Sequence, residues 1–303
     1  MLKGILPPLP TPFKENGALD LDALRSNIEK LNATSLAGYV ALGSNSEAVH
    51  VSPDEATQVF AIVRKAAASD KQVIGGTGQF STHETIAMTK RAADAGCDTA
   101  LIVTPFYYKN AMTADALRTH YHAIADQSPI PIMIYNVPAN TGFNMASSIV
   151  AEIARHPNVI GIKDSAGDIN QLAETVRLTR GKQVNKETRF EVLSGNYSAF
   201  LPGLTFGIVG AILAVSNIAP NECVMIHDLF KQGRIGEAGE LHLRLLPVAR
   251  AVTVQFGVPG LKAAMDTLRV GYFGGWPRSP LLPLGASARV ELEKILREAE
   301  LLK

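Results

Sequence analysis

Two short runs of apolar residues, IPIMIY at residues 130–135 and VIGIK at residues 159–163, decide the fold. Each run is nearly unbroken, which is typical of parallel strands that are buried on both faces. Longer segments with helical periodicity alternate with such runs, for example Asp54–Ala68, which has Pro53 at its start, and Ser81–Ala95. In the second helix Ser81 and Glu84 have the spacing of a capping box.

The same alternation continues from the start of the chain to about residue 220. The predicted strands are Gly4–Pro10, Gly38–Leu42, Gln72–Gly76, Thr99–Val103, Ile130–Tyr135, Val159–Lys163, Phe190–Leu193 and Gly207–Leu213. Eight strand–helix pairs over about 200 residues predict an α/β fold, the (β/α)8 TIM barrel. A doubly wound sheet is the alternative, but no G-x-G-x-x-G motif follows the first strand.

Strand signals stop near residue 220. The remaining residues predict helices over Glu222–Gln232, Ile235–Val254, Gly260–Arg269 and Ser287–Leu301. We therefore expect a barrel over residues 1–220 and, over residues 221–303, a helical extension packed on it.

Composition excludes several classes of protein. With 29 Lys and Arg against 28 Asp and Glu the net charge is +1, so no strong field attracts nucleic acid or anionic lipid. Cys97 and Cys223 form no disulfide framework or zinc motif. No run of 18 apolar residues and no signal-peptide core is present, which predicts a cytoplasmic protein, unless an organelle-targeting segment has been removed.

Residues at the carboxyl ends of barrel strands meet at one mouth, where barrel enzymes have their active sites. Lys163 ends one predicted strand, and partial desolvation would favour its free amine as a nucleophile toward carbonyl groups. Tyr135 ends the preceding strand and could exchange a proton with the substrate. Position alone leaves the alternatives open, namely a lysine paired with Asp164 and a tyrosine that only seals the barrel rim.

Two loops after other strands carry further candidates. Gly43-Ser44-Asn45-Ser46-Glu47 combines a strand-end glycine with hydroxyl and backbone N–H groups that can hold a carboxylate. Thr104-Pro105-Phe106-Tyr107-Tyr108 could line a pocket or a subunit interface. Both patterns are common in ordinary loops and in rim packing. His120 and His122 are two residues apart, which on a helix makes a poor metal pair.

Together, the Gly43–Glu47 loop, Thr104–Tyr107, Tyr135–Gly142 and Ile160–Asp164 resemble the pyruvate-dependent class I aldolases, the family of dihydrodipicolinate synthase and N-acetylneuraminate lyase. The resemblance covers essentially the whole chain. It implies a homotetramer in which Lys163 forms an imine with pyruvate and Tyr135 shuttles protons. Tyr107 would complete a hydroxyl relay from a neighbouring subunit.

The same resemblance implies how the substrate is held. Ser44 and Asn45 would bind the pyruvate carboxylate beside Gly43. Ser165, Asn140 and Ile208 are the other expected substrate contacts. The predicted chemistry uses no metal and no cofactor beyond the covalent imine on Lys163, because the protonated imine is itself the electron sink.

Departures from the family pattern narrow the substrate. Dihydrodipicolinate synthases carry an arginine where this chain has Asn140, and a neutral amide loses a charge-assisted clamp on a second carboxylate. Residues 194–198 lack the acidic residues of neuraminate lyases. The tail Phe256–Lys262 with Gly274-Gly275 is most similar to 4-hydroxy-2-oxoglutarate aldolases. Ser46 stands where the family usually has glycine; a positive φ there would cost about 1–3 kcal/mol.

The sequence therefore predicts a Schiff-base lyase that cleaves a 4-hydroxy-2-oxo acid to pyruvate and an aldehyde, with 4-hydroxy-2-oxoglutarate as the leading substrate. The alternatives are a 2-keto-3-deoxy-sugar-acid aldolase, a dihydrodipicolinate synthase, and a non-catalytic protein that binds 2-oxo acids. The expected partners are the small-molecule substrate and other copies of the chain, not nucleic acid or membrane.

Overall fold

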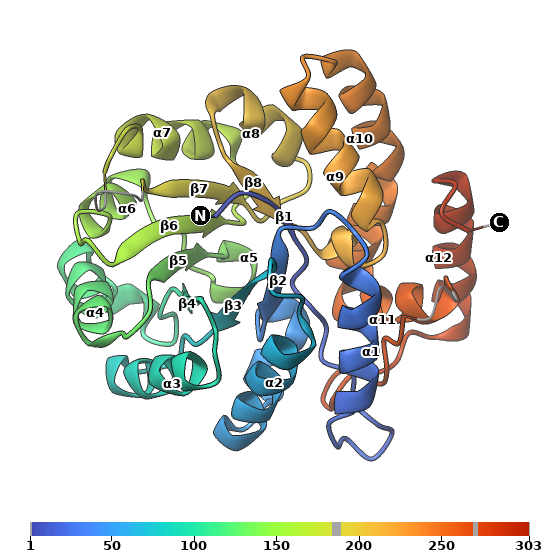
Figure 1. Ribbon diagram of the computed structural model, residues 1–303, viewed down its shortest axis with the longest axis horizontal. Coiled ribbons are helices and arrows are strands. Elements are labelled where there is room, and N and C mark those ends of the chain that lie inside the picture. The colour runs from blue at the N-terminus through green and yellow to red at the C-terminus, as the bar shows by residue number, and fades with distance from the viewer. Residues whose placement is uncertain (1, 184–188, 269–271, 303) are drawn as a thin grey trace. The chain divides into compact units, whose positions relative to one another are not determined.

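The chain is described by a computed structural model over residues 2–183, 189–268 and 272–302 (Figure 1). Packing divides the chain into two compact units, Met1–Gly4 with Ile74–Ile212 and Ile5–Val73 with Leu213–Lys303. These units divide the chain within the barrel and not near residue 220. The predicted boundary between residues 220 and 221 therefore stays a prediction.

All eight predicted strands are present in the described residues. They are β1 Gly4–Leu6, β2 Gly38–Ala41, β3 Gln72–Gly76, β4 Thr99–Val103, β5 Ile132–Asn136, β6 Val159–Asp164, β7 Glu191–Ser194 and β8 Gly210–Ile212. Every residue of β5 and β6 is buried, as expected for strands covered on both faces.

The strand order is that of a barrel. The sheet runs β1-β8-β7-β6-β5-β4-β3-β2, and the neighbours from β3 to β8 pair in parallel. At the two ends of this order, Pro8 forms a parallel bridge with Val40, and the Val40 N–H donates to the Pro7 carbonyl over 2.9 Å. The predicted TIM barrel is thus confirmed, and the doubly wound alternative is wrong.

Helices follow the strands, as Figure 1 shows for α3, α4, α6 and α7 around the outside of β3–β7. The α-helices are α1 Leu21–Leu31, α2 Pro53–Ala66, α3 Thr82–Asp94, α4 Ala114–Gln127, α5 Pro138–Thr141, α6 Ser147–Ile153, α7 Ile169–Thr179, α8 Phe200–Phe206, α9 Pro220–Lys231, α10 Ile235–Arg250, α11 Gly257–Thr267 and α12 Ala286–Glu298. The shorter helical turns are η1 Ser44–Ser46, η2 Ala48–His50, η3 Lys109–Ala111, η4 Ala214–Asn217 and the π-helical η5 Ala251–Gln255.

The ends of two helices follow from their capping residues. Ser52 and Glu55 form a complete capping box at the start of α2, with Pro53 in the first turn. At α3 the Ser81 hydroxyl accepts from the Glu84 N–H over 3.1 Å. The return bond from the Glu84 carboxylate is not found among the described residues, so only half of the predicted box forms there.

Some boundaries differ from the prediction for local reasons. β1 ends at Leu6 rather than at residue 10, because the prolines that follow have no N–H to donate to a ladder. β8 begins at Gly210, since Gly207 is the left-handed cap of α8, with φ 105°. The predicted helix 235–254 becomes α10 followed by η5. Arg269, at the end of another predicted helix, lies outside the described residues.

Cys97 and Cys223 are buried free thiols. None of the described helices is long and apolar enough to cross a membrane.

Candidate active site

Lys163 and Tyr135 lie side by side near the carboxyl ends of neighbouring strands. Tyr135 of β5 is the register partner of Lys163 of β6. The Lys163 Nζ atom lies 4.0 Å from the centre of the Tyr135 ring, and the two residues are only 3% and 5% exposed. A buried amine therefore lies directly against a phenol ring. The roles of Lys163 in imine formation and of Tyr135 in proton transfer stay predictions.

The backbone around Tyr135 is fixed from the neighbouring strand. Thr104 follows β4 and contacts the Tyr135 carbonyl with both its N–H and its hydroxyl, each over 3.1 Å. Thr104 is fully buried, so these bonds are shielded from water. They hold the end of β5, and with it the tyrosine, in one position.

Asp164 does not pair with Lys163. Among the described residues its carboxylate accepts instead from the Ala166 N–H over 2.8 Å and from the Gln171 side chain over 3.3 Å. Burial raises the pKa of the Asp164 carboxyl, although these hydrogen bonds act in the opposite direction. The alternative in which Lys163 is a structural partner of Asp164 is wrong, and the amine stays available for chemistry.

Ser165 and Gly195 lie directly next to the lysine side chain. The Ser165 N–H donates to the Asn136 carbonyl over 2.8 Å, and the Gly195 N–H donates to the Asp164 carbonyl over 2.6 Å. A Cβ atom built on Gly195 would lie 2.9 Å from Lys163 Cε and 3.1 Å from Ser165 Cβ. Sequence reasoning missed Gly195, which reads as an ordinary turn glycine after β7.

The other predicted site residues in the unit that contains Lys163 are dispersed. Tyr107 is 72% exposed, with its ring centre 5.0 Å from that of Tyr108 in an edge contact. Asn140 is exposed on the short helix α5. Ile208 precedes β8 and packs against Gly203 of α8, so the structure does not bring it to Lys163.

The strand register shows which part of β8 is level with the lysine. Lys163 pairs with Leu193 of β7, and Leu193 pairs with Gly210 of β8. Gly210 is therefore the residue of β8 level with Lys163, and Ile208 lies before the strand.

Gly43, Ser44 and Asn45 belong to the other unit. They follow β2, Gly43 is buried, and Ser44 and Asn45 are half-buried at the start of η1. Positive φ angles in this segment occur at Leu42 and Glu47, at 55° and 56°, and not at Ser46.

Ser46 is buried, and its hydroxyl donates to the Leu9 carbonyl. The strain expected at Ser46 is therefore absent, because its backbone has an ordinary right-handed conformation. In the described part of the chain, no group of three or more His, Cys, Asp or Glu residues is arranged to hold a metal ion.

A parallel barrel with a buried lysine beside a tyrosine near its strand ends defines the class: a TIM-barrel protein with these two side chains at the end of the barrel where such proteins have their active sites. Within this class, residues 1–299 match the family model described as the dihydrodipicolinate synthetase family. The chain belongs to this family, whose members are Schiff-base, pyruvate-dependent lyases and aldolases.

Relatives and solved structures agree with this assignment. A 4-hydroxy-tetrahydrodipicolinate synthase of Methanothrix thermoacetophila is 37% identical over 98% of this chain and 96% of its own. The crystal structure of dihydrodipicolinate synthase from Thermotoga maritima has a TM-score of 0.92 at 32% identity, with all of both chains covered. A chloride-inhibited dihydrodipicolinate synthase from Acinetobacter baumannii, complexed with pyruvate, has a TM-score of 0.92 at 29% identity and covers both chains completely.

Proposed function

We propose that this protein is a class I aldolase that cleaves a 4-hydroxy-2-oxo acid to pyruvate and an aldehyde through an imine on Lys163. The observation that carries the proposal is the Lys163 amine, 3% exposed and 4.0 Å from the Tyr135 ring centre. An amine held in this way beside a proton carrier is the arrangement that carbonyl addition and C–C cleavage need.

The proposed reaction begins when the Lys163 amine adds to the C2 carbonyl of the substrate. The Tyr135 phenol gives its proton to the departing hydroxyl group, so that water leaves and a protonated imine and a phenolate form. The Tyr135 phenolate then takes the proton of the 4-hydroxyl group, the C3–C4 bond breaks and the aldehyde departs. The electron pair of that bond moves through C2 to the imine nitrogen, giving an enamine. Tyr135 then returns the proton to C3, and hydrolysis releases pyruvate and the free amine. The imine supplies the electron sink, so these steps use no metal.

The leading substrate is 4-hydroxy-2-oxoglutarate, which would give pyruvate and glyoxylate. Asn140, exposed on α5 directly after β5, supports this choice. A neutral amide at this position lacks the bidentate clamp that an arginine offers to the carboxylate of aspartate semialdehyde.

A second candidate is the synthesis of 4-hydroxy-tetrahydrodipicolinate from pyruvate and aspartate semialdehyde. It is favoured by the names of the relatives, which include synthases 37% and 36% identical to this chain. Both candidates share the imine on Lys163 and differ only in the aldehyde that reacts.

The proposal also assigns roles outside the Lys163 pair. The loop Gly43-Ser44-Asn45 would bind the carboxylate of the 2-oxo acid, with Ser44 in the proton relay. Tyr107, exposed in this chain, would reach the site of a neighbouring subunit in a homotetramer. Sedimentation of the purified protein tests the assembly, and a monomer at micromolar concentration would contradict it.

Borohydride trapping with pyruvate tests the shared step. We expect intact mass to rise by one reduced pyruvate and peptide mapping to place the adduct on Lys163. Lys71 and Lys262, both buried, provide internal controls that should stay unlabelled. Lys163→Met should abolish the adduct. Calorimetric binding of pyruvate without an adduct would instead support a non-catalytic binding protein.

Measured rates then identify the aldehyde half. The enzyme is assayed for cleavage of 4-hydroxy-2-oxoglutarate, for cleavage of a 2-keto-3-deoxy-sugar acid, and for condensation of pyruvate with aspartate semialdehyde. We expect the first kcat/KM to exceed the others by at least about tenfold, equal to about 1.4 kcal/mol. A tenfold preference for either other reaction would overturn the substrate choice while leaving the imine mechanism intact.

A further inference from the structure

A fully buried ion pair lies directly after the Ser44–Asn45 loop. The Lys262 Nζ atom of α11 is 2.6 Å from the Glu47 Oε1 atom, and both side chains are 1% exposed. Removing two charges from water costs several kcal/mol per ion, and apolar replacements of such pairs are often equally stable. Stability alone is thus a weak reason for a chain to carry this pair.

Further hydrogen bonds hold the two side chains of this pair in place. The Lys262 ammonium donates to the Thr11 carbonyl over 2.8 Å and to the Trp276 carbonyl over 2.7 Å. The second oxygen of Glu47 accepts from the Arg278 N–H over 2.8 Å. Two buried charges with this many directional partners leave the Glu47 side chain little freedom.

The backbone of Glu47 is as unusual as its side chain. Its φ and ψ of 56° and 39° are left-handed, a conformation that is costly for a residue other than glycine. Glu47 closes the turn that contains Ser44 and Asn45, and its N–H donates to the Ser44 carbonyl over 3.2 Å. A residue other than glycine keeps this conformation only if its surroundings hold it. In Glu47 they hold the side-chain carboxylate.

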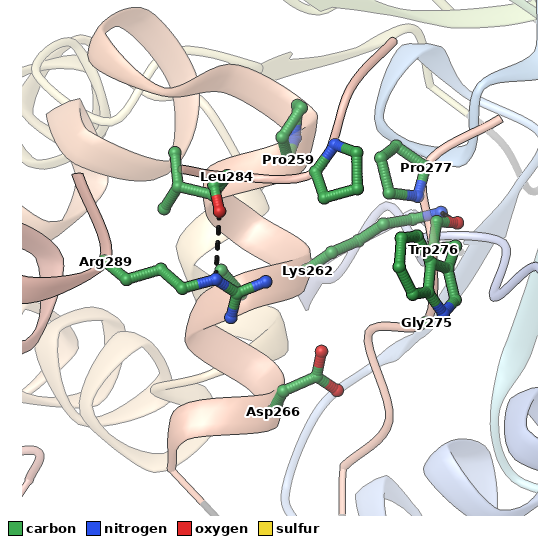
Figure 2. Close-up of a pocket in the computed structure, with 10 residues that line it drawn as sticks. Pro259, Lys262, Asp266, Gly275, Trp276, Pro277, Leu284 and Arg289 are labelled. Carbon is green, nitrogen blue, oxygen red and sulfur yellow. Dashed lines mark hydrogen bonds between the residues drawn. The ribbon is translucent and has the colours of Figure 1, made fainter. Parts of the chain in front are cut away.

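The glycines of the C-terminal tail bring Lys262 to this position. A Cβ on Gly274 would lie 2.6 Å from the Lys262 Cα, and a Cβ on Gly275 would lie 3.0 Å from the Phe13 N atom. Figure 2 shows the Lys262 side chain extended from α11 toward Trp276. Both residues line a cavity of about 250 Å³, together with Asp266 and Arg289. The absence of side chains at Gly274 and Gly275 therefore lets this segment pack closely around Lys262.

We propose that Lys262 and Glu47 are positioning residues, which hold the Ser44–Asn45 turn in the conformation that takes up the carboxylate of the 2-oxo acid. Neither residue touches the substrate; Lys262 acts through Glu47, and Glu47 acts through the turn that it closes. The inference rests on the proposed function, because it assumes that this turn binds the carboxylate.

Borohydride trapping at varied pyruvate concentration tests the inference with the full-length protein. The variants are Lys262→Met, which keeps the length of the side chain without its charge, and Glu47→Gln, which keeps its shape. We expect the half-saturating pyruvate concentration to rise at least tenfold in both, while the trapping rate at saturation falls less than threefold. Lys71→Met is the matched control, because Lys71 is also a buried lysine that donates to two carbonyls, those of Thr34 and Leu36. It should lose stability and keep the wild-type half-saturation.

Acetone provides a second readout that a merely structural role would not give. Acetone has the carbonyl of pyruvate and a methyl group in place of the carboxylate, so its slow trapping on Lys163 should be the same in wild type and variants. An unchanged half-saturation for pyruvate in folded Glu47→Gln would overturn the inference. An equal loss for pyruvate and acetone would overturn it as well. Failure of the proposed function differs from both results, because the wild type itself would then trap no pyruvate.

Discussion

Replacing Gly195 by alanine should separate activity from stability. The added methyl carbon would overlap the Ser165 Oγ atom and would lie 2.9 Å from Lys163 Cε and 3.1 Å from Ser165 Cβ, whereas carbon atoms in contact normally lie about 3.5–4.0 Å apart. The Lys163 Cε atom must therefore move by at least about 0.6 Å, the difference between 3.5 and 2.9 Å. The Ser165 hydroxyl must rotate away as well. Both groups are side-chain ends that can move, so the fold can accommodate the methyl group once they shift.

The chemistry cannot tolerate the same movement. The amine lies one bond beyond Cε, and a misplacement of about 1 Å in an active site can cost about 100-fold in rate. We expect Gly195→Ala to lower kcat/KM by about 10–100-fold, equal to about 1.4–2.7 kcal/mol of transition-state stabilisation. The melting temperature should stay within a few degrees of the wild type.

The assay is the rate of mass gain during borohydride trapping with pyruvate, together with thermal unfolding of the same sample. Gly236→Ala on α10 is the matched control, because a Cβ at that glycine meets no atom within 4 Å. It should leave trapping unchanged and raise stability slightly, by up to about 1 kcal/mol. A folded Gly195→Ala protein that traps pyruvate at the wild-type rate would refute the reasoning.

Three further predictions concern stability. Burial lowers the pKa of His120 to about 4, so folding favours the neutral ring. Stability that is present above pH 6.5 should therefore be lost as the pH falls toward 4. NMR titration of the imidazole should give a midpoint near 4, and a midpoint near 6.5 would contradict this. The hydrogen bond from Arg278 lowers the pKa of Glu55 to about 2, so the pair contributes stability above pH 4.5 that is lost as the pH falls toward 2. Glu55→Gln should therefore lower the free energy of unfolding in urea by about 1–2 kcal/mol at pH 7 and by much less at pH 3. An equal loss at the two pH values would exclude the ion pair as its source. A Cβ on Gly38 would lie 2.7 Å from the backbone N of Gln72, which cannot rotate away, so Gly38→Ala should lower the melting temperature by at least about 5 °C, whereas Gly239→Ala on α10 should not.

The sequence was most informative about the strands and the residues at their ends. Nearly unbroken apolar runs predicted several strands of the barrel, because parallel strands are buried on both faces, and the alternation with helical segments predicted the others. Lys163 and Tyr135 follow from this pattern, since each lies near the end of its strand and consecutive strands of a barrel are neighbours.

Residues that matter because other atoms pack closely against them leave no such pattern in the sequence. Gly195 looks like a turn residue in the sequence, and only the position of the Lys163 side chain shows why a methyl group is excluded there. Ile208 was expected as a substrate contact from the resemblance to the family, and it lay inside a strand predicted over Gly207–Leu213. The left-handed cap at Gly207 moves the strand three residues along the chain, and the end of β8 is Ile212.

The Gly43–Glu47 turn shows the same limit at a single position. The family pattern directed attention to Ser46, but its φ is ordinary and the left-handed residue is Glu47, one position later. A left-handed conformation and a buried charge are each costly, and Glu47 has both. The groups that hold it come from α11 and from the segment after it, through Lys262 and the Arg278 N–H. If Lys262 and Glu47 position the turn as proposed, residues after position 220 set the geometry of a turn that begins directly after β2.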